Sequence, residues 1–146
     1  MTTDLGTTLT RLLAATHRLS RSATIRLEHG YSASYYRTLG ILADGTPLRI
    51  GQLAEYNKIS QPGMTKMLAS LESRDLVQRI QDPTDSRAWL IDITATGREA
   101  LVQRRLELAM VLEQDFVSLS AREIAVLAEA AEILESRSTP APGGNP

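Results

Sequence analysis

The sequence Ser60-Gln61-Pro62-Gly63-Met64-Thr65-Lys66-Met67-Leu68 has the pattern of a short helix with two different faces. Ser60 can cap it, and Pro62 is tolerated because the first turn of a helix does not use the N–H that proline lacks. Apolar residues recur at helical spacing as far as Leu71, while the opposite face is small and polar with a single cation. The pattern therefore predicts a helix that ends near Arg74-Asp75 and exposes a narrow polar face.

A β-hairpin is predicted directly after this helix. Strands are expected over about Val77–Gln81 and Arg87–Ile93, because apolar residues alternate along the second of them. The sequence Asp82-Pro83-Thr84-Asp85-Ser86-Arg87 would then form a long polar loop that ends in arginine. A helix sized for the DNA major groove, followed by an arginine-tipped hairpin, is what a winged helix-turn-helix requires.

Five more helices are predicted around this segment, which makes the fold class mostly α with a small β-hairpin wing. Their expected bounds are about Thr3–Glu28, Ser32–Ala43, Gly51–Tyr56, Thr94 or Thr96 to Val117, and Ser120 onward, the last with Ile124, Leu127, Ala131 and Leu134 facing inward. Gly30 is expected to cap the first helix, and Thr96-Gly97-Arg98-Glu99 and Ser120-Ala121-Arg122-Glu123 fit capping boxes. Leu48-Arg49-Ile50 is a candidate strand, Asn57-Lys58-Ile59 a turn, and residues 138–146 a disordered tail.

Composition places the chain among ordinary globular proteins of one domain. It has 146 residues, a net charge of −1, and no cysteine, which excludes disulfides, thiolate metal sites and thiol-based redox switches. No apolar run is long enough to span a membrane and no secretory signal is visible, so we expect a cytoplasmic protein. Residues 48–93 hold six basic and six acidic side chains. Any contact with DNA must therefore depend on a few placed cations rather than on a basic field.

The predicted fifth helix carries an apolar band that is wider than one stripe. Leu101, Leu108 and Leu112 share one face, and Leu106 and neighbouring apolar residues broaden it sideways. An apolar surface of this width indicates burial on more than one side, and a partner subunit is the simplest cover. We therefore expect a homodimer, with residues 1–30 and 95–137 forming a helical dimerisation region around a DNA-binding lobe at 31–94.

In order and spacing, these features resemble the MarR family of bacterial winged-helix regulators. The motifs that carry the resemblance are Ile50-Gly51-Gln52-Leu53-Ala54, Ser60-Gln61-Pro62, Thr65-Lys66, Leu71-Glu72, Leu76-Val77, residues 82–87, and Ile93-Thr94 with Gly97. The resemblance implies a homodimer that places its fourth helix in the major groove and its wing arginines at the minor groove of double-stranded DNA. It also implies gene regulation, expected here to be repression, that a small aromatic or phenolic ligand relieves. Gly63-Met64 departs from the family pattern.

The expected DNA contacts come from the fourth helix and the hairpin. Backbone N–H groups and the hydroxyl at a helix start can bind phosphate, side chains one turn later can reach base edges, and a wing arginine can enter the minor groove. Asp85 is expected to hold the shape of the wing by pairing with an arginine. In the alternative interpretation, the serine is only a cap and the cations are solvated surface groups. The candidate residues are Ser60, Gln61, Pro62, Thr65, Lys66, Arg79, Asp85 and Arg87.

The resemblance implies a ligand pocket where the dimerisation helices meet the DNA-binding lobe. His17 and Arg21 lie one turn apart, and Tyr35 and Tyr36 open the next helix, so together they could hold an anionic aromatic molecule. The alternative is that these are surface residues and ordinary core tyrosines. No pattern indicates a catalytic residue, a metal site or a cofactor. Two other functions stay open at this point: a winged-helix module that binds protein, and a small-molecule carrier without an operator.

Overall fold

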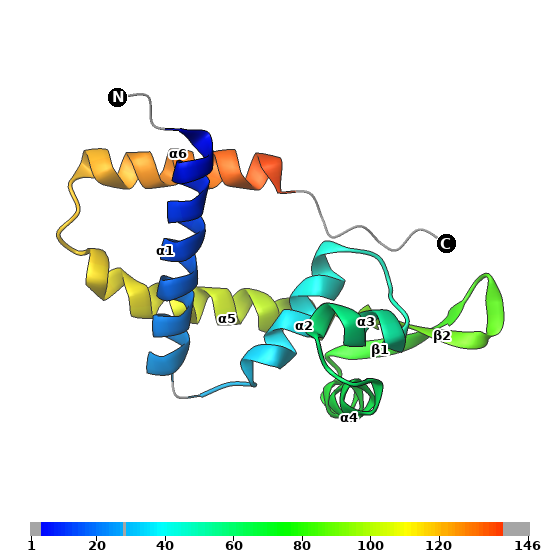
Figure 1. The fold of residues 1–146 in the computed structure, drawn as a ribbon. Helices are drawn as coiled ribbons and strands as arrows, with labels where there is room; N and C mark the ends of the chain where they lie inside the picture. The colour runs from blue at the N-terminus through cyan, green and yellow to red at the C-terminus, as the bar shows by residue number, and fades with distance from the viewer. Residues whose placement is uncertain (1–3, 28, 139–146) are drawn as a thin grey trace.

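Six α-helices and one antiparallel hairpin make up residues 4–27 and 29–138, the part of the chain that the computed structural model describes (Figure 1). The fold class is thus mostly α with a hairpin wing, as predicted. In chain order the elements are α1 Leu5–Arg26, α2 Ala33–Asp44, α3 Ile50–Asn57, α4 Gln61–Glu72, β1 Val77–Asp82, β2 Asp85–Ile93, α5 Ala95–Glu113, a short 3-10 helix η1 Gln114–Phe116, and α6 Ala121–Arg137.

Side-chain caps set where most of these helices begin. The Ser60 hydroxyl accepts a hydrogen bond from the Gly63 backbone N–H at 3.2 Å, as expected for the start of α4. The Ser120–Glu123 capping box at the start of α6 is also confirmed. The prediction of a capping box that begins at Thr96 is wrong. Thr94 caps α5 by accepting from the Gly97 N–H at 3.0 Å, while the Thr96 hydroxyl donates to the Asp75 carboxylate.

Two other local predictions are corrected. α1 ends at Arg26 with Leu27 as its cap, and Gly30 instead lies in the link to α2 with a positive φ of 108°. The expected strand Leu48–Ile50 is reduced to one bridge from Leu48 to Ile91, because Arg49 already caps α3 and Ile50 is its first residue. Thr3 and Glu28, expected at the ends of the first helix, and all of the expected tail except Ser138 lie outside the described residues.

The core lies under α4, where α2, α3, α4 and the hairpin meet. Its fully buried side chains are Leu39, Leu42, Leu53, Met64, Leu68, Leu71 and Ile91. The turn between α3 and α4 is tight because Lys58 adopts a left-handed conformation, with φ 56°. The predicted helix-turn-helix is therefore present, and its second helix rests on the core with its opposite face outward.

α5 leaves this lobe, and in Figure 1 α6 folds back above it while α1 crosses. α1 and α2 both pack on α5. None of the α6 residues is buried, which corrects the expectation that Ile124, Leu127, Ala131 and Leu134 face inward. The helix has few neighbours within the chain, so its apolar residues face outward. α5 also ends at Glu113 rather than at Val117.

Candidate nucleic-acid interface

The outer face of α4 is free of contacts with the rest of the lobe. Pro62, Thr65, Lys66, Ala69 and Ser73 are all exposed, whereas Met64, Leu68 and Leu71 are buried on the opposite side. The Thr65 hydroxyl donates to the Gln61 carbonyl oxygen at 3.0 Å, which leaves its oxygen lone pairs outward. The face is narrow and carries one long cationic side chain, which suits insertion between two phosphate backbones.

The departure from the family pattern at Gly63-Met64 has a partial explanation in this helix. Met64 is fully buried in the core, so its side chain is not available to contact DNA. A Cβ on Gly63 would lie 3.2 Å from the Ser60 hydroxyl oxygen, which is tighter than most such contacts. Glycine therefore leaves the cap undisturbed and keeps the first turn of α4 thin.

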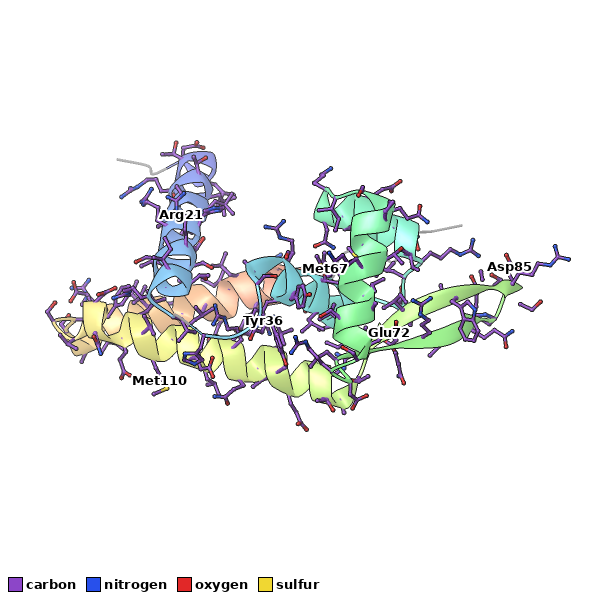
Figure 2. The ribbon with its side chains drawn as sticks, turned by 90° about the horizontal axis from the view of Figure 1, so that it is seen from below. Arg21, Tyr36, Met67, Glu72, Asp85 and Met110 are labelled. Atoms are coloured by element: carbon purple, nitrogen blue, oxygen red, sulfur yellow. The ribbon has the colours of Figure 1, made fainter. Side chains whose placement is uncertain are left out.

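The wing ends in a two-residue turn, not in the long polar loop that was expected. Asp82 pairs with Asp85 in the ladder, and only Pro83 and Thr84 lie between them. The turn closes because one oxygen of the Asp82 carboxylate accepts from both the Thr84 N–H at 2.8 Å and the Thr84 hydroxyl at 2.6 Å. Both strands are therefore longer than predicted, and Figure 2 shows Asp85 at their far end.

Arg87 lies in an irregular part of the second strand. The register shifts between Gln81, which pairs with Trp89, and Asp82, which pairs with Asp85, so residues 86–88 bulge out of the ladder. The Asp85 carboxylate accepts from the backbone N–H of Arg87 at 3.0 Å. Asp85 thus shapes the wing through the backbone rather than through a guanidinium. Among the described residues, no ion pair or hydrogen bond engages the Arg87 guanidinium, which is exposed.

Arg79 is positioned differently from Arg87. Its guanidinium donates to both oxygens of Glu72, the last residue of α4, at 2.7 and 3.2 Å. This bidentate hydrogen bonding raises the pKa of Arg79 and offsets its charge. Figure 2 shows Glu72 where α4 ends beside the strands. The pair joins β1 to α4, so Arg79 can reach a phosphate only while it shares its charge with a carboxylate.

A second ion pair, in which only the carboxylate is buried, was missed by the sequence analysis. The Arg49 guanidinium donates to the Asp82 carboxylate from Nη2 at 2.6 Å and from Nε at 3.1 Å. The hydrogen bonds from Thr84 and then from Arg49 hold the pKa of the Asp82 carboxyl well below its usual range. A signal was available: arginine occupies the cap position of α3, where serine, threonine or aspartate is preferred. Such a residue indicates a task other than capping.

These pairs leave few uncompensated cations in the lobe. Of the six basic residues between 48 and 93, Arg49 and Arg79 are paired with carboxylates, and the Arg74 guanidinium lies 5.2 Å from the Tyr31 ring centre. Within the described residues, Lys58, Lys66 and Arg87 form no ion pair. Lys66 and Arg87 stand on the two features that a winged helix-turn-helix presents to DNA.

Known proteins resemble this chain in sequence and in architecture. The chain is 36% identical over 77 residues to the HTH-type transcriptional regulator YxaD of Bacillus subtilis (strain 168), covering 51% of this chain and 54%, about half, of that protein. It is 30% identical over 118 residues to a putative transcriptional regulatory protein for the hcr operon of Thauera aromatica, covering 80% of this chain and 69% of that one. The MarR family model matches residues 29–88. The chain belongs to the MarR family.

Solved structures show the same fold at low sequence identity. The transcriptional regulator Tm0710 from Thermotoga maritima superimposes with a TM-score of 0.71 at 18% identity, over 88% of this chain and 92% of that one. The PcaV transcriptional regulator from Streptomyces coelicolor, solved in complex with its natural ligand, gives a TM-score of 0.54 at 20% identity, over 92% and 94%. As a MarR-family protein, this chain is a DNA-binding transcriptional regulator with a winged helix-turn-helix, and not an enzyme.

The MarR-family chain also has a hollow where the expected ligand site lies. It measures about 330 Å³ and is lined by His17, Ser20, Arg21, Thr24 and Ile25 of α1 and by Ala33 and Arg37 of α2. The structure thus brings His17 and Arg21 together and adds Arg37, which the sequence analysis missed. Tyr35 and Tyr36 do not line this hollow. Each lies beside Tyr31, with ring centres 6.1 and 5.8 Å away.

In the described part of the MarR-family chain, histidine and acidic side chains do not cluster as metal ligands. No group of three or more histidine or acidic side chains there could hold a metal ion. None of the helices described is both long enough and apolar enough to cross a membrane.

Proposed function

We propose that this MarR-family regulator acts in the cytoplasm as a homodimer that binds a pseudo-palindromic operator and represses transcription. One observation carries the proposal: the exposed face of α4 and the wing each present an uncompensated cation, Lys66 and Arg87. In a dimer, two such helices would enter successive major grooves about one helical turn apart.

The residues of this interface divide by the part of DNA that they would meet. Ser60, Gln61 and Pro62 form the exposed start of α4, where backbone N–H groups favour a phosphate. Thr65 and Lys66 are one turn further on and would reach base edges. Arg87 would enter the minor groove, Asp85 would hold its backbone, and Arg79 would lie near a phosphate while paired with Glu72.

The proposed dimer explains apolar surface that the single chain leaves uncovered. Met110 of α5 is 69% exposed, and Ile124, Leu127 and Leu134 of α6 are 40–56% exposed. Phe116, Leu119, Val126 and Leu127 line a further hollow of about 320 Å³. Apolar surface this extensive marks an interaction site, and a second copy that packs α1, α5 and α6 against their equivalents would bury it.

Gel-shift titration on DNA upstream of the protein's own gene tests the operator proposal. We expect specific binding that weakens with salt, with a slope of log affinity against log salt of about −4, because Lys66 and Arg87 give about four cations per dimer. DNA of the same length and scrambled sequence is the control. A folded dimer that shifts neither DNA at low salt would refute the proposal and favour a protein-binding module.

For the hollow between α1 and α2 we propose an anionic aromatic ligand that relieves repression. Arg21 and Arg37 offer cationic donors to a carboxylate, His17 adds a ring nitrogen that can hydrogen-bond, and the hollow has room for one aromatic ring. A relevant precedent is the PcaV complex with its natural ligand. The hollow joins α1 of the dimerisation region to α2 of the lobe, so a ligand there can alter their relative placement.

Thermal-shift titration with benzoate and hydroxybenzoates, against their uncharged amides, tests this site. A ligand at 100 times its dissociation constant should add about 2.7 kcal/mol to the free energy of unfolding. Arg37→Gln should abolish the shift. If the acids bind and operator affinity does not change, the protein is a carrier rather than a switch, because coupling between two sites is reciprocal.

A further inference from the structure

We propose that Arg49 and Asp82 are positioning residues for the wing: together they anchor the hairpin to the start of α3 and aim Arg87. This inference rests on the proposed operator binding and deepens it. Neither residue is itself an expected DNA contact. They act on the base of the turn from which Arg87 projects.

Asp82 lies at the base of the turn that ends the wing, where it can hold both the turn and the strand. It is the last residue of β1, only 6% exposed, and both of its carboxylate oxygens are used. One oxygen accepts from the Thr84 N–H and hydroxyl and so closes the turn. The other accepts from two nitrogens of Arg49. The same carboxylate thus fixes the shape of the tip and ties it to another element.

Arg49 reaches Asp82 from a segment that is bridged to β2. Its neighbour Leu48 exchanges two backbone hydrogen bonds with Ile91 of β2, at 3.0 and 2.8 Å. This single bridge holds Leu48 against the edge of β2 that faces away from β1. From the next position, the Arg49 guanidinium donates two hydrogen bonds to the carboxylate of Asp82 on β1. The Gln52 side chain accepts from the Arg49 backbone N–H at 2.9 Å, which fixes the Arg49 backbone to the first turn of α3.

The anchored turn determines where Arg87 points. Asp82 pairs with Asp85, and beyond that pair residues 86–88 leave the ladder until Trp89 pairs with Gln81. The bulge is held at two points: the Arg87 N–H bonds to Asp85, and the Gln81 side-chain amide donates to the Ser86 carbonyl oxygen at 3.0 Å. Asp82 thus fixes one end of the bulge, and the anchor to α3 fixes the tip relative to α4.

A hairpin of two strands needs such an anchor. Beyond buried Ile91 the wing has little core, since Trp89 is 52% exposed and residues 83–87 are all exposed. Two strands alone are marginally stable in water. Without the pair, the distal wing would be held only by its own ladder, and Arg87 would sample many directions. Ordering it on DNA would then cost conformational entropy, which lowers affinity.

The single tryptophan of the chain allows a direct test, because Trp89 lies on the wing next to the bulge. The variants are Asp82→Asn, which keeps an oxygen for Thr84, and Arg49→Gln, which leaves the turn intact. Asp115→Asn is the matched control, because it breaks an exposed pair with Arg26 at the far end of the molecule. Both test variants should lower the steady-state fluorescence anisotropy of Trp89 in the free full-length protein. Arg49→Lys should restore most of it.

Operator binding provides the second measurement. Arg87→Ala should weaken binding about tenfold. Arg49→Gln and Asp82→Asn should each weaken it by a similar factor, and combining either with Arg87→Ala should cause little further loss. Additive losses would overturn the positioning claim, as would unchanged anisotropy in both variants. Wild-type protein that shifts no DNA would end the operator proposal instead, and the anisotropy measurement would then decide alone whether the pair anchors the wing.

Discussion

Gly97 shows how one missing side chain fixes the start of α5. A Cβ at this position would lie 2.1 Å from the Leu76 carbonyl oxygen and 2.8 Å from the Ile93 side chain. Because the nearer neighbour is a backbone atom at the start of the hairpin, room for a Cβ could be made only by shifting the backbone of α5 or of the hairpin. The glycine therefore lets α5 begin directly against the base of the wing.

We expect Gly97→Ala to lower the free energy of unfolding by about 1–3 kcal/mol, because the overlap forces the backbone apart. Gly40→Ala is the matched control. Gly40 lies inside α2 with nothing within 4 Å of an added Cβ, so this change should stabilise the protein by about 0.5–1 kcal/mol. Urea unfolding followed by circular dichroism measures both. Equal effects in the two variants would contradict the packing argument.

Lys66 carries the second residue-scale prediction. Lys66→Ala should weaken operator binding and reduce the magnitude of the salt slope by about 2 per dimer, because each protomer loses one counterion-releasing contact. Arg105→Ala removes the same charge from the exposed surface of α5 and serves as the control. Titrating fluorescently labelled operator DNA with each variant at several salt concentrations measures the two slopes. An equal change of slope in both variants would mean that only net charge matters.

At the scale of elements, sequence patterns predicted all six α-helices and both strands of the described residues, but not the exact ends or the short helix η1. Apolar spacing and caps such as Ser60 act locally, so they are visible in the sequence. Thr94 was preferred over Thr96 as a cap because Thr96 bonds instead to Asp75, twenty-one residues away in the chain. The ion pair that ties Asp82 to the start of α3 likewise involves Arg49, which is thirty-three residues away in the chain. Contacts of this kind leave no periodic signal.

The wing should also respond to acid. The bonds from Thr84 and Arg49 lower the pKa of Asp82 in the folded state, so the carboxylate contributes stability that is present above its unfolded pKa of about 3.9. That stability is lost as the pH falls from there toward the lower folded pKa. We expect Asp82→Asn to reduce the loss of stability below about pH 4. Urea midpoints from pH 7 to pH 2.5 test this, and parallel curves for the two proteins would contradict it.

At the scale of the whole molecule, the single chain is incomplete. The sequence indicated a partner from the width of the apolar band on α5, and the structure adds α6, whose residues have little to pack against. The inward placement expected on α6 failed because periodicity reports which side is apolar, not what covers it. For a similar reason, only some of the residues that line the hollow were predicted. His17 and Arg21 share a helix face and can be found from spacing, whereas Arg37 lies on another helix and joins them only in the folded chain.

We expect the wild-type protein to be a dimer at micromolar concentration by light scattering. Leu127→Glu should shift it toward the monomer, because a charge would be buried in the proposed interface, and operator affinity should fall with it. Ile59→Glu, which changes an exposed apolar residue before α4, should leave the mass unchanged. A monomeric wild-type protein that still binds a single half-site tightly would contradict the proposed assembly.

The two carboxylate-paired arginines of the lobe also bear on how the regulator would find its target in a genome. Binding to random DNA depends almost wholly on uncompensated cations, and here Glu72 and Asp82 neutralise Arg79 and Arg49. Non-operator DNA, which outnumbers any operator by about a millionfold or more, should therefore sequester few molecules. A small cellular pool of the protein would then suffice to keep one operator occupied.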